Sequence, residues 1–232
     1  MQQHQIIDHT ITSRHSVRAF KNTPIDIQTI KDILTIACHA PSGNNIQPWK
    51  VYVVTGQKRK ELIDAVCLAQ RQVFKQPIEA NIHQETFKYY PEKWTSPFIE
   101  RRRENGWGLY GLLNIKKGEL DKIQLQHLRN YQLFDAPVGL FFTSNTSLET
   151  GAKMDIAMMM QNVMLAAKAR EIDSCPQAAW NPFHQIVANV LNIPEDEELI
   201  CAIALGYADD SAVVNRFKTS RVAVEEFAIF CD

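Results

Sequence analysis

The sequence lacks the features that place a protein in a membrane or on a secretory route. It has no run of about 18 apolar residues, the length that a membrane-spanning helix needs, and its start, MQQHQIIDHT, has no apolar signal-peptide core. Its five cysteines are widely scattered and form no CxxC pair, which is typical of reduced thiols. We therefore expect a cytoplasmic protein that does not bind a membrane.

Charge of one sign, metal-ligand spacing and a glycine-rich nucleotide loop are also missing. The 232 residues carry a net charge of −1, whereas nucleic-acid-binding domains are usually strongly basic, so nucleic acid is not expected as a partner. The seven histidines show no HExxH or comparable spacing, so no metal is expected. No GxGxxG follows a predicted strand, which argues against a Rossmann dinucleotide site.

What is present is an ordinary content of hydrophobic residues, 45%, whose spacing predicts both helices and strands. We expect helices at 3–13, 23–40, 57–74, 118–134 and 151–172, and strands at 51–54, 136–145 and 198–209. In the second helix, Thr23 is the predicted N-cap and Pro24 the first helical residue. The helix at 151–172 is apolar nearly all round, which predicts a central helix or one at a subunit interface.

The stretch APSGNNIQPWKVYVVTG, residues 40–56, places many turn-forming residues directly before a strand. Pro41, Ser42 and Gly43 are followed by two asparagines, including Asn45. A simple turn needs about four residues of this kind, and this loop carries more side-chain amide than a turn requires. The excess suggests that the loop has a role beyond reversing the chain.

Positive charge gathers with hydroxyl residues near both ends of the chain. Arg14 and Arg18 lie in SRHSVR, with His15 and Ser16 between them, and Lys218 and Arg221 lie in FKTSR. Arginine or lysine beside a hydroxyl group is suitable for binding a phosphate. Either group alone is also consistent with a pair of solvated surface cations, so the residues themselves leave both interpretations open.

Residues 80–130 read as an aromatic-rich insertion among many charges. Its Tyr90, Trp94, Phe98 and Tyr110 offer stacking surfaces that suit flat substrates, which predicts a substrate lid. Ordinary packing of an extra helical hairpin is the alternative. The run 101–103 is three arginines, which would attract an acidic substrate such as a carboxylated aromatic or form a solvated helix face.

Taken together, four segments resemble the flavin-dependent nitroreductase family, in the family's order and over nearly the whole chain. They are SRHSVRAF, APSGNNIQPWKVYVV, DIAMMMQNVMLAAKAREIDSCPQAAW and LICAIALGYAD with the later FKTSR. The segment 89–113 looks like the branch that includes nitrobenzoate-type reductases. The resemblance implies one α+β domain over residues 1–232, with a central, largely antiparallel sheet flanked by helices. It also implies a homodimer with FMN bound at the subunit interface.

The resemblance also implies which residues hold FMN. Arg14 matches an arginine that pairs with the FMN phosphate, with His15 and Ser16 beside it, and Arg221 matches a second phosphate ligand that Lys218 joins. Arg18 matches a basic residue near flavin N1 and O2, where a fixed cation would favour the anionic reduced flavin.

The remaining implied contacts involve the flavin ring. Pro41, Ser42, Gly43 and Asn45 match a loop that one subunit lays over the flavin of the other, and Asn130 is a further candidate for a ring contact. Pro176, Gln177, Ala178 and Ala179 match the segment along the flavin face and edge, where the Ala178 backbone approaches N5. Many relatives carry an acidic residue followed by glycine at 178–179, so this chain departs from the family there.

The implied activity is a two-step exchange in which NADH or NADPH passes hydride to flavin N5 and an electron-poor aromatic, a nitro compound or a quinone is then reduced. No side-chain nucleophile or general acid is expected, because the chemistry belongs to the cofactor. Two alternatives stay open. One is a related flavoenzyme that reduces enones, removes halogens or breaks down flavin, and the other is a non-catalytic flavin-binding dimer.

Overall fold

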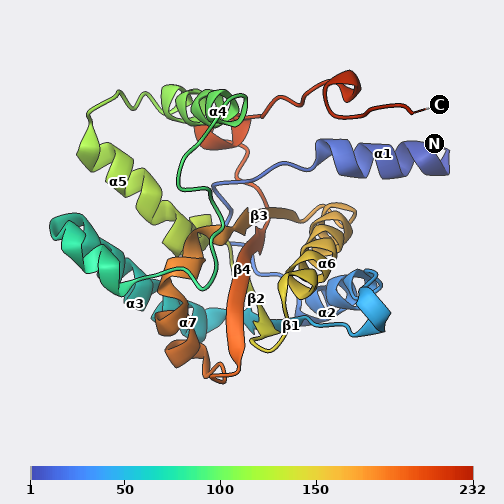
Figure 1. Ribbon diagram of the computed structural model, residues 1–232, viewed down its shortest axis with the longest axis horizontal. Coiled ribbons are helices and arrows are strands. Elements are labelled where there is room, and N and C mark those ends of the chain that lie inside the picture. Colours follow the sequence, from blue (N-terminus) through green and yellow to red (C-terminus); the bar gives the residue numbers. More distant parts are fainter. Residues whose placement is uncertain (1, 232) are drawn as a thin grey trace.

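Residues 2–231 are described by a computed structural model, which contains one four-stranded antiparallel sheet in the order β1-β2-β4-β3 (Figure 1). The strands are β1 (Lys50–Val54), β2 (Val138–Asn145), β3 (Asp173–Gln177) and β4 (Glu197–Gly206). Every pairing between these strands is antiparallel. The predicted α+β class with a central antiparallel sheet is confirmed.

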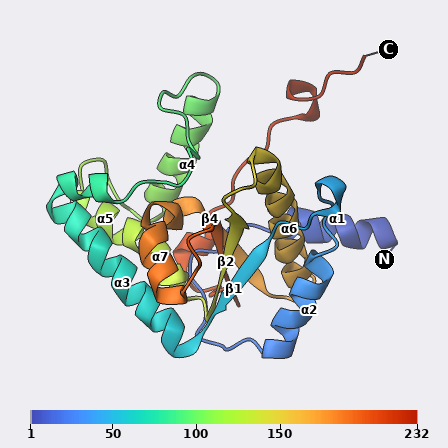
Figure 2. The same ribbon diagram turned by 60° about the horizontal axis from the view of Figure 1, so that its bottom comes forward.

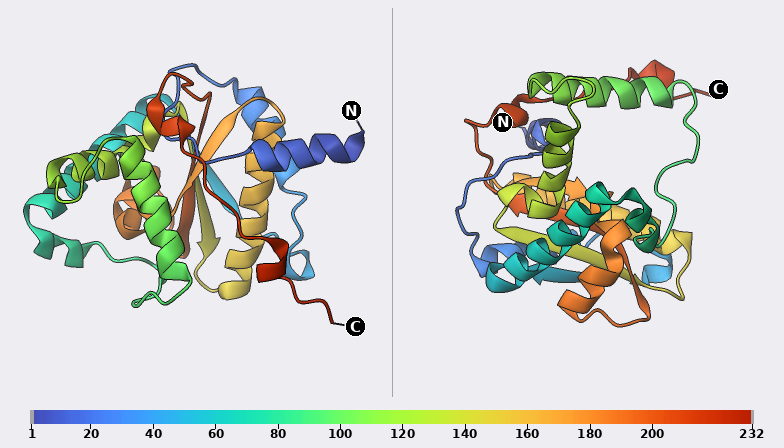
Figure 3. Two further views of the ribbon diagram at one scale, coloured as in Figure 1. Left: turned by 90° about the horizontal axis from the view of Figure 1, so that it is seen from above. Right: turned by 90° about the vertical axis from the view of Figure 1, so that its left-hand side faces the viewer.

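Helices cover both faces of the sheet. They are α1 (Gln3–Ser13), α2 (Ile27–Ala37), α3 (Gly56–Lys75), α4 (Phe98–Leu112), α5 (Leu120–Leu128), α6 (Thr150–Lys168) and α7 (His184–Leu191). Figure 2 shows α2 and α6 on one side of the sheet and α3 and α7 on the other. α4 lies away from the sheet (Figure 3), and no helix within residues 2–231 is long and apolar enough to cross a bilayer.

The two faces of β2 build two separate cores, because successive side chains in a strand point to opposite faces. Leu140 and Phe142 pack into the core beneath α2 and α6, which Ile156 and Val163 of α6 also fill. Phe141, on the opposite face, packs into the second core beneath α3 and α7. The position of β2 in the middle of the sheet therefore explains why it is apolar along nearly its whole length.

The start of α2 differs from the prediction. The helix begins at Ile27 rather than near Thr23, and its N-cap is Asp26. The Asp26 carboxylate accepts hydrogen bonds from the backbone N–H groups of Gln28 (2.9 Å) and Thr29 (3.2 Å), which satisfies two donors that lack a partner within the helix. Pro24 consequently precedes the helix instead of opening it.

The helix predicted at 118–134 ends early, at Leu128, and a 3₁₀ segment follows. Leu133, Phe134 and Asp135 adopt positive φ angles of 53°, 52° and 72°, a conformation that L-residues rarely take. Burial holds them there, since Leu133 and Phe134 lie in the core, and Arg129 forms a bidentate ion pair with Asp135. The helix predicted at 151–172 likewise ends at Lys168.

Three elements were not among the predicted helices and strands: α4, which lies inside the aromatic-rich insertion, β3 and α7. β3 contains Pro176, which has no N–H to donate to a ladder and therefore argues against a strand. The strand forms because β3 is an edge of the sheet that pairs only with β4 among the named strands. α7 carries apolar residues at helical spacing, Ile186, Val187 and Val190, and ends at Asn192 in the left-handed conformation, which is a common helix C-cap.

The segment that follows α1 runs beside β3 and brings the N-terminal arginines to the sheet. Ser16 forms a parallel bridge with Ser174 of β3, and the Val17 N–H donates to the Ser174 carbonyl oxygen at 3.1 Å. Val17 is fully buried. Because successive side chains of an extended chain point to opposite sides, Ser16 and Arg18 on either side of it point toward the surface. This placement fixes where Arg14 and Arg18 can reach.

Candidate functional site

Arg14 and Arg221 lie 207 positions apart in the sequence, yet the charge of Arg221 acts on Arg14 in the folded chain. Burial lowers the pKa of Arg14, and the positive charge of Arg221 lowers it further. The half-buried guanidinium of Arg14 is therefore repelled by the exposed guanidinium of Arg221. Cations from opposite ends of the chain therefore influence each other electrostatically, and their joint binding of one flavin phosphate stays a prediction.

Arg18 is held at the same edge of the sheet by its backbone and its side chain. Its N–H donates to Asn215 Oδ1 at 2.8 Å, and its Nη1 donates to the Ser16 carbonyl oxygen at 3.2 Å. Its guanidinium carbon lies 6.0 Å from the centre of the Phe217 ring, at the outer limit of a cation–π contact. The Arg18 charge thus has a defined place beside β3.

Asn215 is a residue of this site that the sequence did not reveal. Besides holding Arg18, its Nδ2 donates to the carbonyl oxygens of Ala19 (2.7 Å) and Asp209 (2.9 Å). Asn215 therefore ties the segment after α1 to the segment after β4. No motif surrounds it, and an isolated asparagine between Val214 and Arg216 gives no sequence signal of such a role.

Lys218 and Arg221 lie on the exposed C-terminal segment. Arg221 Nη1 donates to Thr219 Oγ1 at 2.6 Å and to the Ser220 carbonyl oxygen at 2.8 Å, so its contacts are local. Among residues 2–231, none of the site cations is paired with a carboxylate; these are Arg14, Arg18, Lys218 and Arg221. A group of cations without carboxylate partners suits a dianionic ligand such as a phosphate.

Burial of Cys175 argues against thiol chemistry at this site. Burial raises the pKa of the Cys175 thiol to about 11, although the charge of Arg18 and a hydrogen bond with Ser16 oppose that rise. The thiolate is the reactive form of cysteine, so Cys175 stays protonated and inert near neutral pH. Its role is to fill space beneath the cations.

The end of β3 and the turn after it form the floor next to the cations. Pro176 and Gln177 end the strand, and Ala178 and Ala179 open the 3₁₀ segment η4 (Ala178–Phe183). Gln177 Nε2 donates to the Asn130 carbonyl oxygen at 2.7 Å, which brings together two residues that the resemblance implies. Gln177 Oε1 is buried and has no partner within the described residues.

The loop that contains Pro41 and Asn45 is exposed and lies beside α6. The Gly43 N–H donates to Asp155 Oδ2 of α6 at 3.1 Å, and the Gln47 N–H donates to Ser42 Oγ at 3.0 Å. Asn44, Asn45 and Gln47 all have positive φ angles, of 49°, 56° and 48°. The amide-rich composition is explained in part by this left-handed backbone, which asparagine tolerates better than most residues.

The four aromatic residues of the predicted lid line one cleft of about 880 Å³: Tyr90, Trp94, Phe98 and Tyr110. Arg102 lies over the Trp94 ring at 5.3 Å, and Arg101 forms an ion pair with Glu226 at 3.5 Å. The Arg103 side chain has no ion pair or hydrogen bond among residues 2–231, and Arg103 also lines the cleft. Trp107, 72% exposed, is a further wall residue that was not predicted.

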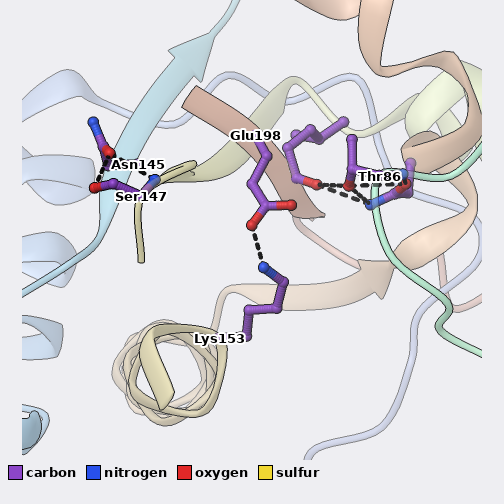
Figure 4. Close-up of polar contacts among 7 residues, drawn as sticks. Thr86, Asn145, Ser147, Lys153 and Glu198 are labelled. Atoms are coloured by element: carbon purple, nitrogen blue, oxygen red, sulfur yellow. Dashed lines mark hydrogen bonds and ion pairs between the residues drawn. The ribbon is translucent and has the colours of Figure 1, made fainter. Parts of the chain in front are cut away.

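A buried polar network anchors the segment that leads to this cleft. Asn181 Nδ2 donates to the Leu199 carbonyl oxygen at 2.8 Å and to Thr86 Oγ1 at 3.0 Å, and the Thr86 N–H donates to Asn181 Oδ1 at 2.8 Å. Figure 4 shows Thr86 beside the start of β4, near the ion pair of Lys153 with Glu198. The network fixes the chain before α4 to the sheet.

Comparisons with known proteins agree with this geometry. Residues 11–207 match the family model described as "Nitroreductase family". The chain is 35% identical to the chloronitrobenzene nitroreductase of Comamonas testosteroni, over 97% of this chain and 96% of that protein. It is 32% identical to the 4-nitrobenzoate reductase of Nocardioides sp. (strain LMS-CY), over 97% and 90% of the two chains.

A solved structure is similar over its whole length. It is the FMN-dependent nitroreductase NfnB from Mycobacterium smegmatis, solved in complex with NADPH. The two chains are 29% identical and superimpose with a TM-score of 0.92, and the match covers 100% of each chain. The family-model match and the full-length relatives above 30% identity establish the relationship. The chain belongs to the nitroreductase family.

Proposed function

We propose that this chain is an FMN-dependent NAD(P)H oxidoreductase that reduces nitroaromatic and related electron-poor compounds. The observation that carries the proposal is the cluster of cations without carboxylate partners, formed by Arg14, Arg18, Lys218 and Arg221. Full-length relatives are named as reductases of chloronitrobenzene and of 4-nitrobenzoate, which supports the substrate class.

The residues present fit FMN. Arg14, Lys218 and Arg221, with Ser16 and His15 nearby, would hold the phosphate. Burial and, after it, the charge of Arg221 lower the pKa of Arg14, and a bound dianion would offset both effects. Arg18 would stand near the flavin N1 and O2 atoms. Bound FMN supplies an atom, N5, that accepts and donates hydride.

The floor of the site would lie along the ring. Pro176, Gln177, Ala178 and Ala179 form a rigid edge at the end of β3, and the contact of Gln177 with the Asn130 backbone holds this edge in place. The unpartnered, buried Oε1 of Gln177 is an acceptor available to a ligand or to a repositioned donor.

A homodimer is part of the proposal. The C-terminal residues Phe227, Ile229 and Phe230 are 68%, 90% and 82% exposed, and α6 exposes Met154 and Met158. Apolar patches of this kind on a folded chain mark interaction surfaces. α1 and the C-terminal segment project from the same end of the molecule (Figures 1 and 2), and the loop of Pro41, Ser42, Gly43 and Asn45 would cover the partner's flavin.

The cleft next to α4 would receive the aromatic substrate. Aromatic walls suit a flat ring, and the unpaired guanidinium of Arg103 would pair with a carboxylate on that ring. We therefore propose that carboxylated nitroaromatics bind better than their neutral counterparts. Five free cysteines are compatible with a reducing compartment such as the cytoplasm.

Absorbance of the purified protein tests this function. The protein should be yellow from bound flavin, and anaerobic NADH or NADPH should bleach that colour within seconds, after which 4-nitrobenzoate should restore it. The double variant Arg14→Ala with Arg221→Ala should be folded but lose FMN on gel filtration, with Lys75→Ala as an unrelated cation control. A colourless wild-type protein that ignores added FMN would refute the proposal.

Bleaching without recovery in the presence of nitroaromatics would instead identify a flavoenzyme of another specificity. Flavin that neither nucleotide reduces would identify a non-catalytic flavin binder. Arg103→Gln should raise the KM for 4-nitrobenzoate and leave the KM for nitrobenzene unchanged, and equal effects on both substrates would refute the carboxylate contact.

A further inference from the structure

The C-terminal segment that carries Lys218 and Arg221 lies along one face of α4. Three contacts follow in antiparallel order: Arg101 with Glu226 at 3.5 Å, Glu104 with Ser220 at 3.2 Å, and Gly108 with Phe217. Positions 101, 104 and 108 share one helix face, because residues three and four apart are neighbours on an α-helix. Figures 1 and 3 show the segment beside α4.

Gly108 is the point of closest approach between the helix and the segment. A Cβ atom at this position would lie 2.6 Å from Cε2 and 3.3 Å from Cζ of Phe217, and such close distances require something to move. A Cβ at Gly111, in the same helix, would meet no atom within 4 Å. The absence of a side chain therefore matters at position 108 and not at position 111.

The same Phe217 ring also lies near the Arg18 guanidinium. The Arg18 guanidinium carbon lies 6.0 Å from the ring centre, and the Arg18 backbone is fixed by Asn215 Oδ1 at 2.8 Å. Because the Arg18 backbone is fixed, a displaced ring would move the guanidinium rather than the chain. One aromatic side chain thus connects the backbone of α4 to a site cation.

We propose that Gly108 and Phe217 are positioning residues that couple the lid helix α4 to the flavin site. This inference rests on the proposed function and adds to it a link between the substrate cleft and the cofactor. The α4 helix serves as the support on which the C-terminal phosphate-binding segment lies, and the Phe217 ring sets the position of the Arg18 charge.

The coupling makes the two ligands interdependent. A substrate that fixes α4 also fixes the segment of Lys218 and Arg221, so it should tighten FMN, and FMN should tighten substrate by the same factor, because linkage between two sites is reciprocal. Displacement of Arg18 from the flavin should also disfavour the anionic reduced form and lower the midpoint potential.

The test compares Gly108→Ala with Gly111→Ala in the full-length protein. Both replace a helical glycine with a better helix former, but only the first places a methyl group against Phe217. We expect Gly108→Ala to weaken FMN binding by about fivefold or more, in the range of typical coupling between sites, and to shift the midpoint potential of bound flavin to more negative values. Gly111→Ala should change neither.

A third variant separates this effect from misfolding. Adding Phe217→Leu removes the ring edge that a methyl group at 108 would meet, so Gly108→Ala should have little further effect on FMN affinity in that background. Circular dichroism checks that all variants are folded. Equal FMN affinity and potential for Gly108→Ala and Gly111→Ala would overturn the coupling, whereas a wild-type protein that does not bind FMN at all would overturn the proposed function instead.

Discussion

Asn181 offers a direct test of how the chain before α4 is held. Asn181 is 1% exposed. Its Nδ2 donates to the Leu199 carbonyl oxygen at 2.8 Å and to Thr86 Oγ1 at 3.0 Å, and its Oδ1 accepts from the Thr86 N–H at 2.8 Å and lies 3.3 Å from Thr86 Oγ1. The substitution Asn181→Ala removes all of these contacts. It leaves the N–H of the half-buried Thr86 without this partner.

The expected loss follows from these contacts. A net hydrogen bond contributes about 1 kcal/mol and an unsatisfied buried group costs about 1–3 kcal/mol. The Leu199 carbonyl oxygen keeps its bond from Thr86 Oγ1 at 3.2 Å, so not every group is orphaned. We expect the free energy of unfolding to fall by about 2–4 kcal/mol, a large part of the roughly 5–15 kcal/mol that stabilises a typical domain.

Urea unfolding at one fixed protein concentration measures this loss, since association would otherwise change the apparent stability. Ser147→Ala is the control, because its exposed hydroxyl bonds only to Asn145, and it should change stability by less than about 0.5 kcal/mol. Limited proteolysis should cut Asn181→Ala faster than wild type between residues 86 and 98. A loss below about 0.5 kcal/mol would show that the network does not anchor this segment.

Two further predictions concern a helix cap and a buried thiol. Asp26→Ala should lower the free energy of unfolding by about 1 kcal/mol, because it removes the N-cap of α2, and Thr23→Ala should leave it unchanged; equal losses in urea unfolding would refute the cap assignment. Burial raises the pKa of the Cys175 thiol to about 11 in the folded state. As the pH rises, the thiol therefore loses its proton at a lower pH in the unfolded state than in the folded state. Burial of the protonated Cys175 thiol therefore contributes fully to the free energy of unfolding below about pH 9, and this contribution is lost as the pH rises from about 9 to about 11. Cys175→Ala should lessen this decline in thermal unfolding, and an unchanged decline would contradict it.

Local features of the fold were predictable from the sequence, and contacts between distant segments were not. The spacing of apolar residues indicated α3, α6, β2 and β4. The two helices bury apolar residues at helical spacing, and the two strands are buried on both faces, so each leaves a pattern in the sequence. β3 escaped prediction since Pro176 is acceptable only at a sheet edge, and strand order cannot be read from the residues. The cap at Asp26 was missed because Thr23 and Pro24 offered an equally plausible start.

The candidate site divides in the same way. Arg14, Arg18 and Arg221 stood out as charges beside hydroxyl residues, and the four aromatic residues of the cleft stood out by their density. Asn215 and Gly108 did not, because their roles depend on the backbone that each one meets after folding. An asparagine that bridges two segments and a glycine that makes room for a ring leave no local pattern.

The short pairing of Ser16 with Ser174 has a consequence for solubility. β3 is an edge strand, and an uncovered edge is a template on which another chain can add a strand. Residues 16–17 occupy part of that edge, while the opposite edge, β1, begins with the charged, exposed Lys50, a residue type that discourages such addition. A chain shortened past residue 18 should therefore aggregate through β3, even though its hydrophobic core would be largely intact.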